Sequence, residues 1–283
     1  MSITMVDFIG IGAQRSGTSW TYACLYEHPE ICIPIKEIHF FSRERFANGK
    51  EWYEANFKNC DAKKIKGEFS TSYLYSEETA ERIHSMYPDT KIIAIIRNPI
   101  SRAFSQYGNA IKGGEIPESM SFEEYYTTDA SVLAQGMYTK QLERYFSLFN
   151  RSQILVLVYE DNKKDPQKFM EQIYSFLGVD LNFVPSMLHD EINISRVPKH
   201  IWIEKRMHKF SEFLRRNGLD KVVHLIRQSG LPELIRSVNT KPKKAEKPVF
   251  DREALVLHFR DDVAKLSSML NRDLSSEWGI HNH

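Results

Sequence analysis

The sequence predicts an α/β fold with an open, mostly parallel sheet flanked by helices on both faces. Short apolar runs rich in β-branched residues alternate with amphipathic helical runs along most of the chain, and this alternation is typical of parallel sheets. A glycine-rich turn joins the first apolar run to the first helical run. With 283 residues, 42% hydrophobic and 27% charged, the chain has the size and balance of one large globular domain.

Four strands are expected, and two of them are nearly unbroken apolar runs, which is typical of strands buried on both faces. These two are KIIAIIR at 91–97 and QILVLVY at 153–159, and the others lie at 6–11 and 64–69. The expected helices lie at 18–27, 76–87, 99–111, 136–149, 165–177 and 251–272. Asn98 followed by Pro99 predicts an N-cap and a first helical residue.

The pattern changes over 197–247, which reads as basic amphipathic helices followed by a lysine- and proline-rich loop. We interpret it as a helical insertion or cap within a single domain of 1–283. Such a basic stretch suits weak contact with an anionic membrane surface or with an anionic or lipidic acceptor. More often such a stretch is an ordinary helix with a solvated charged face, and these alternatives stay open.

Composition also limits localisation and partners. Cys24, Cys32 and Cys60 are an odd number without metal-ligand spacing, which predicts free, mostly buried thiols in a reducing compartment. The sequence has no apolar run of membrane-spanning length and no secretory signal pattern. The net charge is +1 and no nucleic-acid-binding module is present. We therefore expect a cytoplasmic protein with no metal and no nucleic-acid partner.

The turn after the first strand has the features of an anion-binding loop. Gly12 and Gly17 have the spacing of a nucleoside-triphosphate P-loop, and the following helix N-terminus directs N–H groups toward a ligand. Thr18 stands where that motif requires lysine, and the cation lies inside the loop at Arg15. This departure disfavours a kinase or GTPase without removing it as an alternative.

A second candidate anion site follows the 91–97 strand. Arg97 ends that strand and Ser105 lies eight residues later on the next helix. Ligands of open α/β sheets bind outside the carboxyl ends of the strands, where an arginine and a serine can hold a phosphate through charge-assisted hydrogen bonds. Taken together, the two sites predict a ligand with phosphate groups at both ends.

These segments resemble the sulfotransferases that use 3′-phosphoadenylyl sulfate (PAPS). GAQRSGTSW resembles their 5′-phosphosulfate loop, and IIRNPISRAFSQY resembles their 3′-phosphate segment. Four further segments look like the glycosaminoglycan-type and bacterial branch of the family: KEIHFFS from 36, GEFSTSYL from 67, GMYTKQLERYF from 136 and QILVLVYED from 153. The resemblance spans roughly 6–190 and includes the terminal helix. It implies a P-loop-like sulfotransferase fold.

The resemblance implies a set of residues for PAPS and for its product, adenosine 3′,5′-bisphosphate (PAP). The 5′-phosphosulfate would be held by Arg15, Ser16, Gly17, Thr18, Ser19 and Trp20. Arg97 and Ser105 would hold the 3′-phosphate, with Tyr138 in the GMYTKQLERYF segment nearby. A late basic loop often closes over the nucleotide in this family, and Lys241, Lys243 or Lys244 could supply it.

Sulfuryl transfer needs a base for the acceptor and stabilisation of charge on the leaving nucleotide. Glu37 matches the proposed base of the family, His39 is its partner or alternative, and Glu68 could compete for the role. Arg15 departs from the usual lysine. Arginine stays protonated and cannot readily act as a general acid, but electrostatic stabilisation of a phosphate leaving group does not require one. Ser42 replaces an aspartate of several carbohydrate-modifying relatives, which suggests an acceptor other than heparan chains.

Three functions follow from these residues. The first is an active PAPS sulfotransferase acting on a hydroxyl or amine of a small molecule, glycan or lipid. The second is a P-loop enzyme dependent on a nucleoside triphosphate. The third is a non-catalytic protein that binds PAP, in which Arg15 marks lost chemistry.

Overall fold

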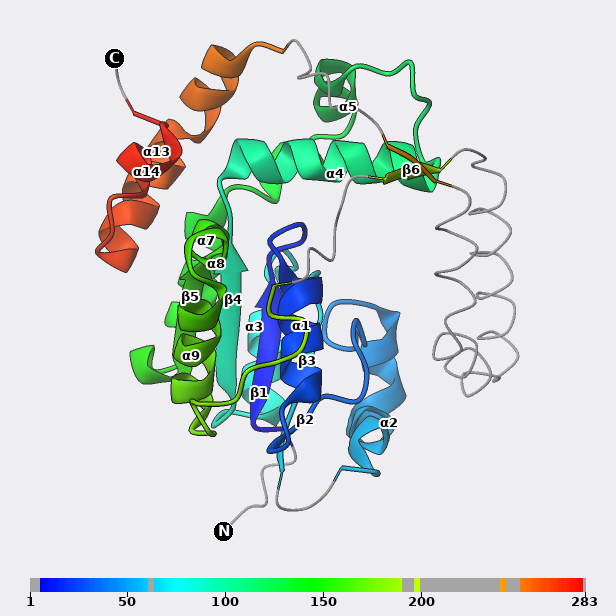
Figure 1. Cartoon of the computed structure of the whole chain (residues 1–283), viewed down its shortest axis with the longest axis vertical. Helices are drawn as coiled ribbons and strands as arrows, with labels where there is room; N and C mark the ends of the chain where they lie inside the picture. The colour runs from blue at the N-terminus through cyan, green and yellow to red at the C-terminus, as the bar shows by residue number, and fades with distance from the viewer. Residues whose placement is uncertain (1–5, 61–63, 190–195, 199–239, 243–249, 282–283) are drawn as a thin grey trace. The chain divides into compact units, whose positions relative to one another are not determined.

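A computed structural model describes residues 6–60, 64–189, 196–198, 240–242 and 250–281. Its centre is a five-stranded sheet with all strands parallel, in the order β2-β3-β1-β4-β5 (Figure 1). The strands are β1 (Phe8–Gly12), β2 (Ile31–Cys32), β3 (Ile65–Phe69), β4 (Lys91–Ile96) and β5 (Ile154–Val158). A separate antiparallel pair joins β6 (Arg196–Pro198) to β7 (Thr240–Pro242). The predicted α/β class with a parallel sheet is confirmed.

The helices alternate with the strands. In chain order they are α1 (Thr18–Glu27), α2 (Gly49–Glu54), α3 (Thr79–Met86), α4 (Pro99–Gly113), α5 (Phe122–Thr128), α6 (Ser131–Ala134), α7 (Tyr138–Phe146), α8 (Tyr159–Lys164), α9 (Pro166–Leu177), α13 (Arg252–Leu270) and α14 (Leu274–Trp278). Short 3₁₀ turns lie at Glu44–Asn48, Ala55–Phe57 and Arg151–Gln153. The predicted helices and strands within the described residues agree with these bounds to within about three residues at each end.

The core forms because β4 is apolar and buried from Ile92 to Ile96 and therefore needs cover on both faces. Ile93 and Ile95 belong to a cluster with Leu25 of α1 and Ile173 of α9, all fully buried. Ile92, Ala94 and Ile96 are fully buried as well, and they point to the opposite face because side chains alternate along a strand. Figure 1 shows α1 and α9 in front of the sheet and α3 behind it. Helices thus flank both faces, as predicted.

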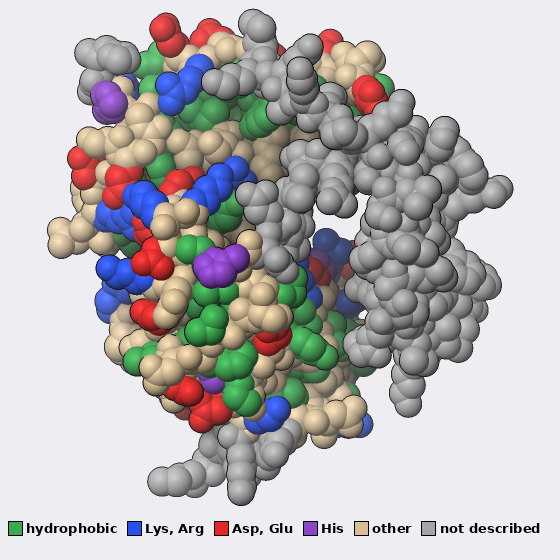
Figure 2. All heavy atoms as spheres, viewed as in Figure 1, with side chains coloured by type: hydrophobic (Ala, Val, Ile, Leu, Met, Phe, Trp, Pro, Cys, Tyr) green, Lys and Arg blue, Asp and Glu red, His purple; other side chains and the backbone are tan. Residues whose placement is uncertain are grey.

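The described chain divides into two compact units. The first comprises 1–103, 130–192 and 251–283, and contains the parallel sheet; the second comprises 104–129 and 193–250. α4 runs from one unit into the other. Most of the predicted insertion at 197–247 lies outside the described residues, and the single-domain organisation stays a prediction. On the face drawn in Figure 2, acidic and basic side chains are interspersed, in keeping with the net charge of +1.

The terminal helix packs within the first unit. Asp262 of α13 is buried, and its carboxylate accepts hydrogen bonds from the backbone N–H of Thr139 in α7 at 3.2 Å and 3.4 Å. The Thr139 hydroxyl donates in turn to the Asp262 carbonyl at 2.8 Å. Burial raises the pKa of the Asp262 carboxyl group above its usual value, while the hydrogen bonds from Thr139 oppose that rise. These paired hydrogen bonds fasten α13 to α7.

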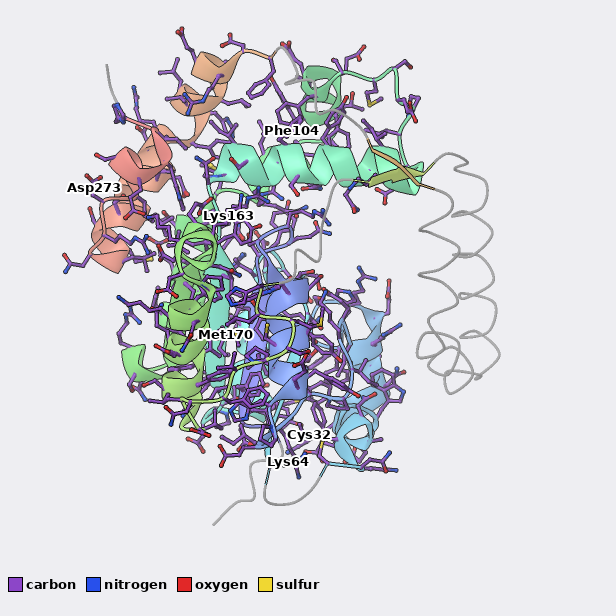
Figure 3. All side chains as sticks on the ribbon, in the orientation of Figure 1. Cys32, Lys64, Phe104, Lys163, Met170 and Asp273 are labelled. Atoms are coloured by element: carbon purple, nitrogen blue, oxygen red, sulfur yellow. A yellow bond between two sulfur atoms is a disulfide. The ribbon has the colours of Figure 1, made fainter. Side chains whose placement is uncertain are left out.

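The prediction that all three cysteines are free thiols is wrong. Cys32, at the end of β2, forms a disulfide with Cys60, and Cys24 is the free buried thiol (Figure 3). The two partners are 28 residues apart, and only the return of the chain after Ala55–Phe57 brings them together. The expected reducing compartment rested partly on three free thiols, and the disulfide removes that support. The cytoplasmic localisation stays a prediction.

Candidate active site

The loop between β1 and α1 closes tightly beneath the N-terminus of α1. Gly17 lies before the helix with φ 83°, and its carbonyl accepts the N–H groups of Trp20 and Thr21 at 3.0 Å and 3.1 Å. A Cβ on Gly17 would lie 2.7 Å from the Tyr159 ring, so only glycine fits both the left-handed backbone and the close approach. Ser16 and Thr18 are buried, and Ser19 is half-buried at the start of α1.

Arg15 and Arg97 lie next to each other, although 82 residues separate them in the sequence. The Arg97 Nη1 donates to the Arg15 carbonyl at 3.0 Å, and the Arg97 guanidinium stacks on the Tyr159 ring at 4.7 Å. Burial and the neighbouring charge of Arg97 lower the pKa of Arg15. The Arg97 Nε is buried without a hydrogen-bond partner among the described residues. Two neighbouring cations, one with an unsatisfied donor, favour a bound anion.

The residues around Arg97 hold its backbone in place. The fully buried Tyr138 hydroxyl, at the start of α7, donates to the Arg97 carbonyl at 2.9 Å. Burial raises the pKa of Tyr138 to about 12, so the phenol stays protonated and remains a donor. Asn98 caps α4 as predicted, because its Oδ1 accepts the Ser101 N–H at 3.1 Å. Glu160 accepts the N–H of Asn98 at 3.2 Å.

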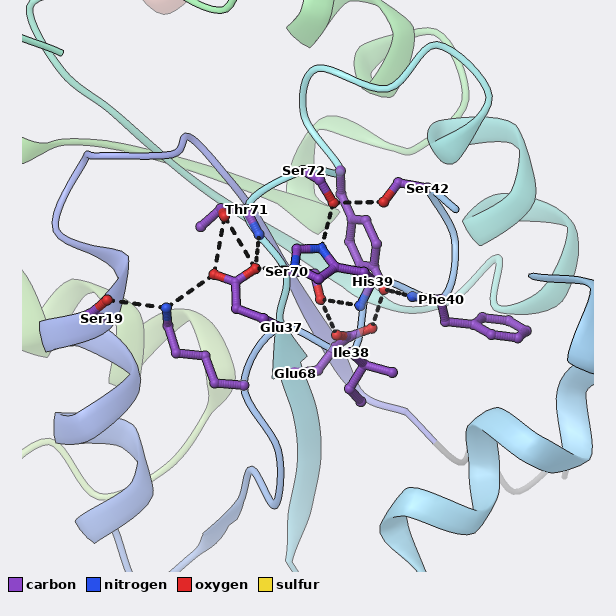
Figure 4. Close-up of polar contacts among 12 residues, drawn as sticks. Ser19, Glu37, Ile38, His39, Phe40, Ser42, Glu68, Ser70, Thr71 and Ser72 are labelled. Atoms are coloured by element: carbon purple, nitrogen blue, oxygen red, sulfur yellow. Dashed lines mark hydrogen bonds and ion pairs between the residues drawn. The ribbon is translucent and has the colours of Figure 1, made fainter. Parts of the chain in front are cut away.

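Glu37 is the centre of a hydrogen-bond network between the loop after β2 and the end of β3 (Figure 4). Its carboxylate accepts from the backbone N–H and the hydroxyl of Thr71, each at 3.0 Å. Lys36 Nζ lies 3.0 Å from Glu37 Oε1 and donates to the hydroxyl of Ser19 at 3.1 Å. Lys36 therefore links the carboxylate directly to the first turn of α1, where the anion loop ends.

His39 contacts both Glu37 and a pair of serine hydroxyls. Its Nε2 lies 3.1 Å from Glu37 Oε2, its Nδ1 lies 2.7 Å from the Ser72 hydroxyl, and that hydroxyl lies 2.6 Å from the hydroxyl of Ser42. Burial lowers the pKa of His39 to about 4, with Glu37 opposing and Arg43, Arg45 and Lys36 adding to the fall. His39 is therefore neutral at pH 7. Because an ionised carboxylate only accepts, Nε2 carries the hydrogen and Nδ1 accepts from Ser72.

Glu68, the competing carboxylate, faces away from solvent. It is fully buried, and it accepts hydrogen bonds from the hydroxyls of Tyr53, Tyr73 and Ser70 at 2.9 Å, 2.8 Å and 2.7 Å. Burial raises its pKa to about 7 against these hydrogen bonds. The Glu37 side chain is 26% exposed. Only Glu37 of these two carboxylates can meet an acceptor molecule directly.

The remaining predicted site residues fall in different places. Trp20 lies in the core, where its ring packs on Phe169 and its indole N–H donates to the Met187 carbonyl at 3.1 Å. Ser105 is half-buried on α4 and belongs to the second unit, so its joint grip with Arg97 stays a prediction. Lys241 lies in β7, paired with Val197. Lys243 and Lys244 lie outside the described residues.

Sequence reasoning missed Lys36, Thr71, Ser70, Ser72 and Tyr159. Lys36 directly precedes the predicted base, and the three hydroxyl residues all lie in the GEFSTSYL segment. The available signal was this cluster of hydroxyl residues directly after a strand, where the carboxyl end of a parallel sheet binds ligands. Tyr159 also follows a strand directly.

The described residues contain neither a metal-ligand cluster nor a membrane-spanning helix. No group of three or more histidine, cysteine, aspartate or glutamate side chains in the described part of the chain could hold a metal ion. The same part contains no helix long and apolar enough to span a membrane. The expectation that the chemistry needs no metal stays a prediction.

Fold and site together define an open α/β protein with two neighbouring arginines, Arg15 and Arg97, at its strand tips and a cluster of Lys36, Glu37 and His39 nearby. The chain belongs to the sulfotransferase domain family, whose family model matches residues 6–228. It is therefore an enzyme of the sulfotransferase class. A sulfotransferase from Alicyclobacillus acidocaldarius has a similar structure, with 27% identity and a TM-score of 0.68 over 97% of this chain and 98% of the other.

Curated relatives resemble only part of this chain. The bifunctional heparan sulfate N-deacetylase/N-sulfotransferase 4 of Mus musculus is 30% identical over 195 residues, which cover 61% of this chain and 22% of the relative. The heparan sulfate glucosamine 3-O-sulfotransferase 3B1 of Mus musculus is 31% identical over 176 residues, or 60% and 45%. The chain thus spans less than half the length of these relatives.

Proposed function

We propose that this enzyme transfers a sulfuryl group from PAPS to a hydroxyl or amine, with Glu37 as the base. One observation carries the proposal. The anion loop around Arg15, the guanidinium of Arg97 and the Glu37 carboxylate come together at the carboxyl ends of neighbouring strands, linked by Lys36 and Ser19.

The donor fits the two adjacent cations. Arg15, with Ser16, Gly17, Thr18 and Ser19, would hold the 5′-phosphosulfate at the N-terminus of α1, where a helix favours negative charge. Arg97 and Ser105 would hold the 3′-phosphate, and the buried Arg97 Nε supplies a donor that needs an acceptor. Charge that develops on the departing phosphate would be stabilised by Arg15 without proton transfer.

In the transfer step one proton moves, one bond to sulfur forms and one bond to sulfur breaks. The acceptor O–H or N–H gives its proton to Glu37 while its oxygen or nitrogen forms a bond to sulfur, and the bond from sulfur to the phosphate oxygen breaks. PAP leaves with the electron pair. Glu37 suits this role because its side chain is the more exposed of the two, at 26% against 18% for His39. The Nδ1 of His39, the ring nitrogen able to accept a proton, already accepts a hydrogen bond from Ser72. His39 orients the carboxylate.

The acceptor belongs to a class that carries free hydroxyls or amines: a carbohydrate, a lipid or a secondary metabolite. The names of the two heparan sulfate relatives support the carbohydrate option. The basic stretch at 197–247 would meet an anionic or lipidic acceptor, or touch a membrane surface weakly. These assignments, and a cytoplasmic location, form part of the proposal.

Ligand binding separates the proposal from a nucleoside-triphosphate enzyme. Thermal shift and calorimetry would compare PAP with ATP and magnesium. We expect PAP to bind more tightly, since Thr18 replaces the lysine that grips β- and γ-phosphates. Tighter binding of ATP with magnesium would support the P-loop alternative. Transfer from labelled PAPS into extracts and acceptor panels would then separate an active enzyme from a non-catalytic protein that only binds PAP.

Substitution of Glu37 tests the base. Glu37→Gln should lower transfer about 10²–10⁴-fold, the usual contribution of a positioned base, with PAP affinity changed less than about twofold. Glu77→Gln is the matched control, because that side chain is 83% exposed, and it should leave the rate unchanged. Steady-state kinetics would measure both. If Glu37→Gln retains the rate while His39→Asn abolishes it, His39 is the base.

A further inference from the structure

Glu68 makes contacts that reach residues 37–40, the segment that carries the proposed base and is called the base segment below, without touching the substrate side of the site. The hydroxyls of Tyr73 and Ser70 donate to its carboxylate at 2.8 Å and 2.7 Å. The same two oxygens accept backbone N–H groups from the base segment: Ser70 from His39 at 3.0 Å, and Tyr73 from Phe40 at 2.9 Å (Figure 4).

The direction of these hydroxyls depends on Glu68. A hydroxyl has one hydrogen and two lone pairs, so a hydroxyl that donates to Glu68 must turn its lone pairs toward the backbone of the base segment. When Glu68 is ionised, above its raised pKa of about 7, its carboxylate accepts and cannot donate, and it then fixes this direction for both hydroxyls at once. An apolar residue or an amide at the same place would leave the direction open.

The base segment needs such support because its backbone is strained. Glu37 and His39 have φ of 63° and 54°, in the left-handed region. This region is sterically unfavourable for a non-glycine residue. Such a conformation persists only when surrounding contacts over-determine it. The backbone N–H bonds to Ser70 and Tyr73 are contacts of this kind.

We infer that Glu68 is a positioning residue for sulfuryl transfer, which acts through Ser70 and Tyr73 to hold Glu37 and His39 in their working orientation. The expected effect of Glu68 on the rate of sulfuryl transfer rests on the proposed function. A buried carboxylate is costly to maintain, and burial already raises the pKa of Glu68 to about 7. No cation pairs with Glu68 among its described contacts, which are the three hydroxyls.

Two buried tyrosines provide a matched pair for the test. Tyr53 and Tyr73 both donate to Oε1 of Glu68, and only the Tyr73 hydroxyl also accepts a backbone N–H of the base segment. Tyr53→Phe therefore removes a hydrogen bond to the carboxylate and leaves the base segment held. Tyr73→Phe removes the same kind of bond together with the support of Phe40. Ser70→Ala removes the support of His39.

The experiment measures the transfer rate, PAP affinity and the ¹⁵N signals of the His39 imidazole in each variant, with His39→Asn assigning the signals. Glu68→Gln, Tyr73→Phe and Ser70→Ala should each lower kcat about tenfold or more, since small misplacements of reacting groups cost up to about 10² in rate. The KM for PAPS and the Kd for PAP should change less than about twofold. The His39 signals should shift in all three variants, and Tyr53→Phe should retain both rate and signals.

The inference is overturned if Tyr73→Phe and Ser70→Ala keep the wild-type rate and His39 signals. It is equally overturned if Tyr53→Phe loses as much rate as Tyr73→Phe, because the network would then act through stability alone. Should Glu68→Gln fail to fold, the other three variants decide the question. The imidazole signals need no acceptor. A wild-type protein without transfer activity but with these shifts would contradict the proposed function and leave the positioning role intact.

Discussion

Glu68 and His39 lie in the same network, yet burial shifts their pKa values in opposite directions. Burial disfavours the charged form of each, which raises the pKa of the acid to about 7 and lowers that of the imidazole to about 4. Near pH 6, the folded protein holds a proton on Glu68 that the unfolded chain releases. It lacks a proton on His39 that the unfolded chain partly binds.

These shifts predict opposing pH dependences of stability. As the pH falls from 7 to 4.5, Glu68 stabilises the fold because the folded state binds the extra proton. As the pH falls from 6.5 to 4, His39 destabilises it because the unfolded state binds the extra proton. Each effect is on the order of 2–3 kcal/mol, so they largely cancel in the native protein.

Urea unfolding of two variants between pH 4 and 7 would separate these effects. His39→Asn should become more stable as the pH falls, and Glu68→Gln should become less stable. The comparison is between the slopes of the free energy of unfolding against pH. A loss of stability that is the same at every pH therefore does not affect it. Equal slopes in both variants and the native protein would contradict the two shifts.

Single residues could be predicted from sequence where a motif fixes their place. Arg15 and Arg97 were expected directly after strands and Glu37 was expected as the base, and the structure brings all three to one end of the sheet. The links between them were not predictable, because Lys36–Ser19 and His39–Ser72 depend on where two loops meet. Trp20 was predicted to bind the cofactor because it belongs to the loop motif. Its ring lies in the core instead, because it is on the face of α1 that packs against Phe169.

At the scale of elements, the turn before α1 gives a sharp prediction. Gly17→Ala should weaken both folding and PAP binding, because a Cβ would press on the Tyr159 ring beneath Arg97. Gly178→Ala is the matched control: φ is 78°, similar to the 83° of Gly17, and nothing lies within 4 Å of its Cβ. The control should cost about 1 kcal/mol from backbone strain alone.

Denaturant unfolding and PAP calorimetry would measure both variants. We expect Gly17→Ala to lose at least about 1 kcal/mol more stability than Gly178→Ala, together with most of its PAP affinity. Gly178→Ala should bind PAP normally. Equal losses of stability, with PAP binding intact in both, would show that the close approach to Tyr159 does not matter.

The elements themselves were predictable because their apolar periodicity is strong. The runs at β4 and β5 read as buried strands, and Asn98-Pro99 marked the start of α4 correctly. β2 was missed because it has only two residues, and their pairing with Ile65 and Lys66 is decided by tertiary contacts. α2 and α5 were missed too, since short helices carry little periodicity.

For the whole molecule, the disulfide was the feature that sequence could not supply. It closes a loop of 28 residues, and a crosslink over such a loop stabilises by about 3–4 kcal/mol in the chain-entropy description. Reduction should therefore lower the melting temperature, and Cys60→Ser should melt lower and ignore reductant. Cys24→Ala is the control that keeps the crosslink, and its melting should still respond to reductant.

Calorimetry with and without reductant would measure this effect, and thiol titration would report the redox state. Native protein should show almost no reactive thiol, since Cys24 is buried and burial raises its pKa to about 12. Identical melting with and without reductant, when titration confirms two released thiols, would contradict the stabilisation.

The closed loop between Cys32 and Cys60 contains Glu37, His39 and Ser42. Purification in dithiothreitol would reduce the Cys32–Cys60 disulfide and open the loop that contains the base segment. An assay of that preparation would then measure a different molecule from the oxidised one. Buffer composition thus becomes an experimental variable in the search for the acceptor. A screen run only under reducing conditions would test only the form that lacks the Cys32–Cys60 crosslink.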